Sequence, residues 1–276
     1  GEDNDPWNTF NTGFGTHGTE VMVDGAAEGN DGDGHIGICP NCAVLPVRLG
    51  DTFIVDGYRA AQGIAFAVDS GASSMGLAVG ALSTPENMAL AVEYAHEAGM
   101  TLVGAAGDEN AYHHNFPAVL GDFLYVHSIH FDTSDRDDTY SFQNFFNCNN
   151  YGPRIDFVAP SPGCATGSVA IINGLSGLIS SYSDQQGLGL DIDERRQIIR
   201  ATVDDIWLSP EESEAASTYP SNEGWDPFYG YGRVNAGRAL EQMESGEIPP
   251  VARFGGPDWF ALYNPEQNPT VPLELW

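Results

Sequence analysis

Short apolar stretches alternate with stretches of helical periodicity along most of this chain, and this alternation constrains its fold more than any other feature. Residues 71–80 are small and mostly apolar, and residues 101–105 form a second such stretch. Both are typical of buried strands. Residues 55–70 instead carry apolar side chains at helical spacing, with Ala61, Ile64 and Val68 on one face.

The full set of expected elements follows the same alternation. The expected strands are 43–49, 71–80, 101–105, 123–129 and 155–158, and the expected helices are 17–27, 55–70, 87–99, 169–182, 192–204 and 235–243. Strands and helices that follow one another at such short intervals indicate a parallel sheet with helices on both faces. The sequence therefore predicts a three-layer α/β fold, with functional groups at the carboxyl edge of the sheet.

Charge excludes several classes of partner. The 276 residues include 39 Asp and Glu against 10 Lys and Arg, which gives a formal net charge of −29. Nucleic acids and anionic membranes both need a positive surface, so neither is an expected partner. No run of eighteen apolar residues occurs, so no transmembrane helix is expected. A largely solvated acidic surface suits a salty or extracellular setting.

The four cysteines, Cys39, Cys42, Cys148 and Cys164, suit an oxidising compartment because they are even in number. They allow three pairings. The Cys39-Pro40-Asn41-Cys42 spacing also fits half a zinc site or a redox pair. We favour structural disulfides, with buried free thiols as the alternative.

Composition changes near residue 245. Residues 245–276 contain six prolines and several aromatic residues, and they show no helical period. We therefore expect one α/β domain over residues 1–244. The remainder is either a strap over that domain or the start of a further one.

Three short motifs stand in an order that suggests a function: His17-Gly18-Thr19, Gly104-Ala105-Ala106-Gly107-Asp108-Glu109-Asn110 and Thr166-Gly167-Ser168-Val169-Ala170. In this order they resemble the His, oxyanion and Ser blocks of the subtilisin-like serine proteases. Three connecting segments, 37–48, 158–160 and 229–236, are similar to the family's as well. The resemblance covers residues 13 to about 240 and implies a subtilisin-like fold.

The resemblance implies roles for three residues. It assigns His17 the role of general base. It assigns Ser168, at the start of an apolar helix, the role of nucleophile. Asp108 stands where the family has an Asn that donates to the oxyanion. An ionised Asp108 would repel the oxyanion, whereas a protonated one would still donate a hydrogen bond.

The family's orienting Asp has no counterpart here. It lies on a strand well before the His block, whereas only sixteen residues precede His17, and they contain no apolar strand. We expect a separate amino-terminal segment that carries this Asp. It would dock beside the strand at 43–49 or the strand at 101–105.

Further site residues follow from the resemblance. Ala78, Val79 and Gly80 align with the strand that binds substrate through its backbone; a plain core strand is the alternative. Asn30, Asp31 and Asp33 fall where many members bind calcium, and a solvated acidic turn is the alternative. No other cofactor is expected. The loop before Ser168 is shorter than the family's, and we expect a Cys148–Cys164 disulfide to close it, with Cys39 and Cys42 on one short connection.

The sequence thus predicts a secreted serine endopeptidase that acts through an acyl-enzyme. The alternative is a catalytically inactive binding or structural protein on the same fold. That alternative is supported by Asp108, by Ile172 in place of a proline, by the short 160–168 loop and by the absent Asp.

Overall fold

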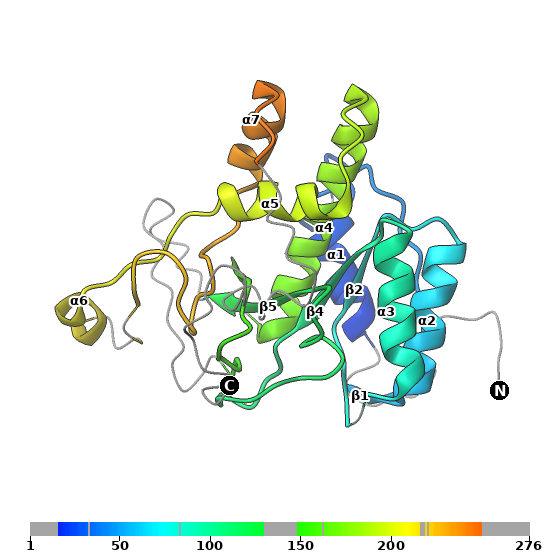
Figure 1. Cartoon of the computed structure of the whole chain (residues 1–276), viewed down its shortest axis with the longest axis horizontal. Helices are drawn as coiled ribbons and strands as arrows, with labels where there is room; N and C mark the ends of the chain where they lie inside the picture. Colours follow the sequence, from blue (N-terminus) through cyan, green and yellow to red (C-terminus); the bar gives the residue numbers. More distant parts are fainter. Residues whose placement is uncertain are drawn as a thin grey trace, which may run out of the picture.

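The structure is a computed structural model that describes residues 16–32, 34–82, 84–129, 148–161, 163–215, 219 and 221–249. Figure 1 shows its elements in chain order. They are α1 (His17–Ala26), β1 (Ile54–Val55), α2 (Gly57–Asp69), β2 (Ser74–Leu77), β3 (Gly80–Ala81), α3 (Glu86–Glu97), β4 (Thr101–Ala105), β5 (Phe123–Ile129), β6 (Phe157–Pro160), α4 (Ala165–Gln186), α5 (Ile192–Ala201), α6 (Pro210–Ala215) and α7 (Ala236–Ser245).

The main sheet has four parallel strands in the order β2-β4-β5-β6. Every residue of β4 and β5 is buried. Alternate side chains enter two separate cores, because successive residues of a strand point to opposite faces. Leu102 and Phe123 belong to the core shared with α2 and α3, whereas Val103 and Leu124 belong to the core shared with α4. The predicted three-layer α/β arrangement is confirmed.

Helix α4 is the longest element and lies against β2, β4, β5 and β6. Helix α1 packs directly on it (Figure 1). Glycines make this approach possible: a Cβ on Gly174 would lie 2.6 Å from the Gly25 carbonyl oxygen, and a Cβ on Gly25 would lie 3.0 Å from that of Ala170. The two helices that begin with the predicted His and Ser motifs are therefore neighbours.

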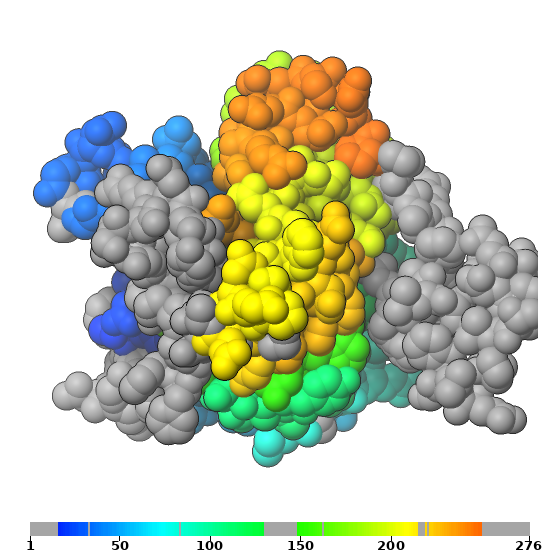
Figure 2. Space-filling model, turned by 90° about the vertical axis from the view of Figure 1, so that its left-hand side faces the viewer, coloured from blue at the N-terminus to red at the C-terminus, as the bar shows by residue number. Residues whose placement is uncertain are grey.

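The two edges of the main sheet differ. Beyond β6, the segment before α7 continues the backbone pairing, since Val158 donates to Gly232 and Val234 donates to Val158. Residues from α5 to α7, yellow to orange in Figure 2, form much of that face of the molecule. At the other edge, β2 pairs with no described strand except β4. An edge of this kind leaves a row of backbone groups open to pairing.

Most predicted elements agree with the structure, and α1, α2, α3, α5 and α7 begin and end within about three residues of expectation. The predicted strand at 43–49 was wrong: residues 42–50 have no regular structure. An extended segment needs a partner along its edge, and none is provided by the described residues. The predicted strand 71–80 is divided into β2 and β3, and α4 begins four residues earlier than expected, at Ala165.

Two further expectations concern membrane-spanning helices and the segment 245–276. In the described part of the chain, no helix combines the length and the apolar character needed to cross a membrane. The Pro- and aromatic-rich segment expected at 245–276 falls mainly on residues 250–276, which lie outside the described residues.

Candidate active site

His17 is the first residue of α1 and is half-buried. Its ring lies edge-on to Phe53, with 4.7 Å between ring centroids. Burial lowers the pKa of His17, and the charge of Glu20 partly offsets this. The imidazole is thus favoured in its neutral form, which is the form that accepts a proton.

Ser168 lies within the first turn of α4 and is fully buried. Its Oγ donates a hydrogen bond to the carbonyl oxygen of Ala165 at 2.8 Å. The expected position was the start of the helix. Because the helix begins at Ala165, Ser168 instead lies at the end of the first turn of α4.

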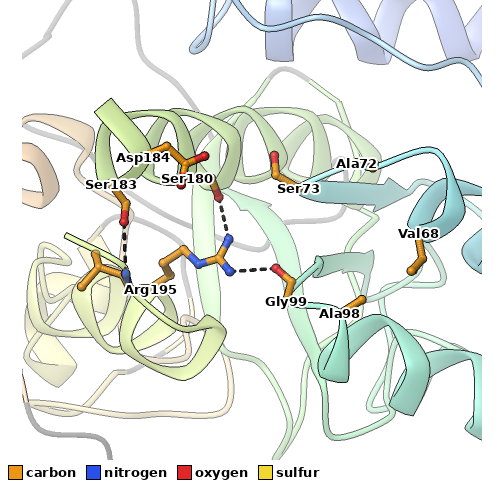
Figure 3. A pocket seen from close by; sticks show the side chains of 11 residues that line it. Val68, Ala72, Ser73, Ala98, Gly99, Ser180, Ser183, Asp184 and Arg195 are labelled. Carbon is orange, nitrogen blue, oxygen red and sulfur yellow. Dashed lines mark hydrogen bonds between the residues drawn. The ribbon is translucent and has the colours of Figure 1, made fainter. Parts of the chain in front are cut away.

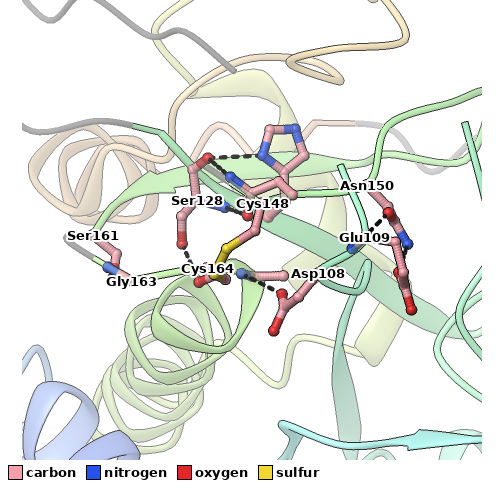
Figure 4. The surroundings of a disulfide bond; sticks show 11 residues. Asp108, Glu109, Ser128, Cys148, Asn150, Ser161, Gly163 and Cys164 are labelled. Atoms are coloured by element: carbon pink, nitrogen blue, oxygen red, sulfur yellow. Dashed lines mark hydrogen bonds between the residues drawn. A yellow bond between two sulfur atoms is a disulfide. The ribbon is translucent and has the colours of Figure 1, made fainter. Parts of the chain in front are cut away.

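Asp108 faces the amino end of α4, as Figure 4 shows. Its Oδ1 accepts a hydrogen bond from the backbone N–H of Ala165 at 3.0 Å. The amino end of a helix favours a negative charge, because its first N–H groups have no partner within the helix. The structure thus brings Asp108 and the start of α4 together. The backbone N–H that donates to Asp108 is that of Ala165, not that of Ser168.

Competing effects act on the pKa of Asp108. The residue as a whole is exposed, yet loss of water around its carboxyl raises this pKa. The N–H of Ala165 lowers it, and the charge of Glu109 raises it. The net direction is upward, so a proton is held on Asp108 to a higher pH than on an ordinary Asp.

Both expected cysteine pairs are present as disulfides, and the described residues contain no free cysteine. Cys148 and Cys164 are joined with their Cα atoms 5.6 Å apart, and Cys39 and Cys42 with theirs 5.4 Å apart. Cys164 is the residue that precedes α4. The bond to Cys148 therefore attaches the start of α4 to the segment 148–150 (Figure 4).

The predicted substrate segment lies between β2 and β3. Ala78 and Val79 form the connection and Gly80 opens β3. Part of their backbone is already engaged, since Gly80 donates to the Phe53 carbonyl at 2.7 Å and Asn115 Nδ2 donates to the Val79 carbonyl at 3.4 Å. Asn115 also donates to the Ala105 carbonyl at 2.8 Å, which joins this segment to the end of β4.

The predicted calcium residues are only partly described. Asn30 and Asp31 lie in the exposed loop after α1, and Asp33 lies outside the described residues. Within the described ranges, no group of three or more His, Cys, Asp or Glu side chains is placed to hold a metal ion. The calcium site stays a prediction.

A groove of about 580 Å³ runs between α1, residues 42–53, β2 and the first half of α4. We call it the β2 groove. His17 lies among its lining residues, together with Val44, Leu45 and Asn173. Val44 and Leu45 are 46% and 43% exposed. The Oδ1 of Asn173 is buried and has no hydrogen-bond partner. The groove therefore presents apolar walls and one unsatisfied polar atom beside an unpaired strand edge.

A smaller cavity of about 270 Å³ is lined by Arg195, Gly99 and Ser180, among others. Figure 3 shows the Arg195 guanidinium donating to Ser180 Oγ and to the Gly99 carbonyl oxygen, each at 2.7 Å. These bonds join α5 to α4 and to the turn after α3. We assign them a structural role.

Sequence reasoning missed Asn115 and Asn150. The Asn115 side chain bonds to the carbonyls of Val79 and Ala105, and the Asn150 side chain, which is fully buried, bonds to the backbone of residues 106–111. No periodicity or spacing marks such residues, because their partners are set by how loops meet.

Comparisons with known proteins show which sequences this chain resembles. The profile of the subtilase family (peptidase S8) matches residues 1–188. Thermitase from Thermoactinomyces vulgaris is 28% identical over 244 residues, which covers 87% of this chain and 78% of thermitase. A thermophilic serine proteinase from Bacillus sp. (strain AK1) is 29% identical over 239 residues, which covers 81% of this chain and 52% of that proteinase.

Solved structures confirm the fold. The prenylagaramide maturation protease PagA superposes with a TM-score of 0.62 at 18% identity, over 83% of this chain and 81% of PagA. Fervidolysin from Fervidobacterium pennivorans, described as a keratinolytic enzyme related to subtilisin, superposes with the same TM-score at 19% identity, over 86% of this chain and 36% of fervidolysin. The three-layer fold is therefore subtilisin-like.

Proposed function

The chain belongs to the subtilase family, and on that premise we propose that it is a secreted serine endopeptidase that cleaves peptide or protein substrates through an acyl-enzyme. The match of the family profile to more than half of the chain carries this proposal. Two disulfides and a net charge of −29 support an extracellular setting.

In the proposed reaction, neutral His17 takes the proton of Ser168 while Ser168 Oγ attacks the substrate carbonyl carbon. The proton then passes from His17 to the leaving amine, and water releases the acyl group by the reverse sequence. The Ser168 hydroxyl must first leave the Ala165 carbonyl oxygen. The proposal therefore requires the Ser168 side chain to rotate away from Ala165 and to become exposed when substrate binds.

Asp108 would face the developing oxyanion in its protonated form. Its raised pKa supports this assignment, since a protonated carboxyl can donate where an ionised one only accepts. Ionisation of Asp108 at higher pH is then expected to slow the reaction.

His17 also needs a carboxylate to orient its ring. Within the described part of the chain, Glu20 is the charged group that raises the pKa of His17. The β2 groove is the proposed binding position for this carboxylate, because the groove adjoins both His17 and the free edge of β2. An extended segment bearing an Asp, paired with β2, would fill it. The alternative position beside β4 is closed, because β2 and β5 already pair with both edges of β4.

Native mass spectrometry of the protein from its source tests this segment. We expect the native mass to exceed the mass of this chain measured under denaturing conditions, because the docked segment is a separate polypeptide. Leu45→Asp, in the groove wall, should release it. Leu90→Asp on the outer side of α3, where Leu90 is 58% exposed, should retain it. A peptide-hydrolysing protein whose native mass equals that of the denatured chain alone contradicts the expected segment.

A second candidate function is peptide binding without hydrolysis. The complete burial of Ser168 and its bond to Ala165 favour it, because an enclosed hydroxyl cannot reach a substrate carbonyl. This candidate shares the fold and the groove with the first.

A fluorophosphonate probe separates the two functions, since it reacts only with an activated serine. The endopeptidase proposal expects an adduct on Ser168 that Ser168→Ala and His17→Ala abolish. Ser176→Ala is the matched control, because Ser176 is also buried in α4 and also donates to a carbonyl of its own helix, that of Ile172, at 2.9 Å. Folded protein that gives no adduct favours the binding function.

A further inference from the structure

Asn150 holds both ends of the loop that carries Asp108. Its Oδ1 accepts hydrogen bonds from the backbone N–H groups of Glu109 and Ala111, each at 3.2 Å. Its Nδ2 donates to the Ala106 carbonyl at 3.1 Å and to the Glu109 carboxylate. Asn150 is fully buried. Both polar atoms of the Asn150 side chain thus form hydrogen bonds with residues 106–111.

The loop turns sharply around the Asn150 side chain. Gly107 has φ +101° and Asn110 has φ +51°. A Cβ on Gly107 would lie 2.6 Å from Asn150 Nδ2, so the loop passes close to the Asn150 side chain. Gly and Asn adopt positive φ more readily than other residues, so these angles mark a tight turn of the loop. The Asn150 side chain lies on the inner side of this turn and bonds to its backbone.

The same segment is joined to the start of α4. The backbone of Asn150 donates to the Gly107 carbonyl at 2.9 Å, and Asn110 donates to the Cys148 carbonyl at 3.1 Å. Cys148 is bonded to Cys164 at the start of α4, where Asp108 accepts from Ala165. The loop, the segment 148–150 and the start of α4 therefore form a closed ring of contacts around Asp108 (Figure 4).

We propose that Asn150 is a positioning residue that fixes Asp108 against the start of α4, where the oxyanion would form. Asn150 touches neither substrate nor reacting atoms in this role; it acts through the loop 106–111. The inference rests on the proposed peptidase function for its catalytic consequence. Its structural part stands on the contacts of Asn150 alone.

Asn150→Ala tests the proposal against a matched control, Asn149→Ala. Asn149 is the neighbouring residue and is equally buried, but its side chain bonds to the backbone of Ser128 rather than to the loop. Hydrogen exchange of the Glu109 and Ala111 amides is the first readout. Asn150→Ala should accelerate it about tenfold or more, as expected for the loss of a buried hydrogen bond. Asn149→Ala should leave it unchanged.

Two further readouts separate positioning from general stability. The NMR-detected titration of the Asp108 carboxyl should shift in Asn150→Ala and not in Asn149→Ala. Peptide hydrolysis in Asn150→Ala should lose about tenfold or more in kcat with KM nearly unchanged, because only transition-state contacts are disturbed. Protein that never hydrolyses peptides refutes the proposed function, while exchange and titration still decide the role of Asn150.

The proposal is overturned if Asn150→Ala shows the same amide exchange and the same Asp108 titration as the wild-type protein. If Asn150→Ala does not fold, Asn150→Asp serves instead. It keeps both accepted bonds but places a second carboxyl against Glu109, so activity should recover as pH falls and these groups are protonated. An Asn150→Asp chain with the wild-type pH profile also overturns the proposal.

Discussion

Asp156 is a buried carboxylate placed between two guanidinium groups. Its oxygens accept from Arg196 at 2.9 Å, from Arg154 at 3.2 Å and from the Tyr125 backbone N–H at 2.8 Å. Burial by itself would raise the pKa of Asp156, but Arg196 and Arg154 outweigh it and hold this pKa below its usual range. The carboxylate joins β5, β6 and α5, so its removal should weaken the whole domain.

Asp156→Asn keeps the side-chain shape and an acceptor for Tyr125, but it removes the carboxylate charge that pairs with the buried Arg154 and the partly buried Arg196. Removing one partner of a buried ion pair costs about 3–5 kcal/mol. Arg154 also donates to the carbonyls of Leu120, Gly121 and Phe123, which continue to stabilise its charge. We therefore expect the lower end, about 3 kcal/mol, which corresponds to a urea midpoint lower by roughly 1 M.

Urea unfolding of both proteins at several pH values is the assay. Because the folded pKa of Asp156 is lowered, its stabilisation is present above the unfolded pKa of about 3.9 and is lost as pH falls through the folded value. The difference between wild type and Asp156→Asn should thus be constant near neutral pH and shrink below about pH 4.

Asp204→Asn is the control for this experiment. Asp204 also pairs with two arginines, Arg233 and Arg238, each at 3.0 Å, but its side chain is 28% exposed against 7% for Asp156. Water replaces a lost partner there, so the effect should be clearly smaller. An Asp156→Asn protein no less stable than Asp204→Asn, or one whose deficit persists at low pH, refutes the reasoning.

Three other predictions concern the disulfide, a second buried carboxyl and the oxyanion position. Replacing Cys148 and Cys164 by Ser should lower the free energy of unfolding by about 3 kcal/mol in urea titrations; an unchanged midpoint contradicts this. Burial raises the pKa of Asp226 to about 6, so the folded state retains a proton that the unfolded state releases, and stability should fall as pH rises from about 4 to 6. Asp226→Asn should remove that pH dependence, and a retained slope would assign it to another group. Asp108→Asn should keep hydrolysis active at higher pH, where wild-type Asp108 ionises; lower activity at every pH contradicts the assigned donor role.

Local sequence was sufficient for the layers of this fold and for several placements in the site. The apolar stretch at 101–105 had to be buried on both faces, and β4 is buried at every residue. Apolar periodicity placed α2, and the His17 motif placed the start of α1. The pairing of Cys148 with Cys164 came from the family resemblance, because the loop before Ser168 is shorter than the family's. Each of these depends on residues close in sequence or on composition within one segment.

Tertiary contacts decided the rest. Residues 43–49 have the composition of a strand, yet strand formation needs a neighbour, and the groove beside them holds none of the described residues. Ser168 was expected at a helix start, but α4 extends back to Ala165, where Asp108 accepts its first free N–H. Asn150 bonds to residues 106–111, and Asp156 bonds to Tyr125 and Arg196 as well as to its near neighbour Arg154, so most of these partners are distant in the chain. Such partners are brought together only when the chain folds, because hydrogen bonds and ion pairs of this kind depend on the distance between atoms and not on their separation in sequence.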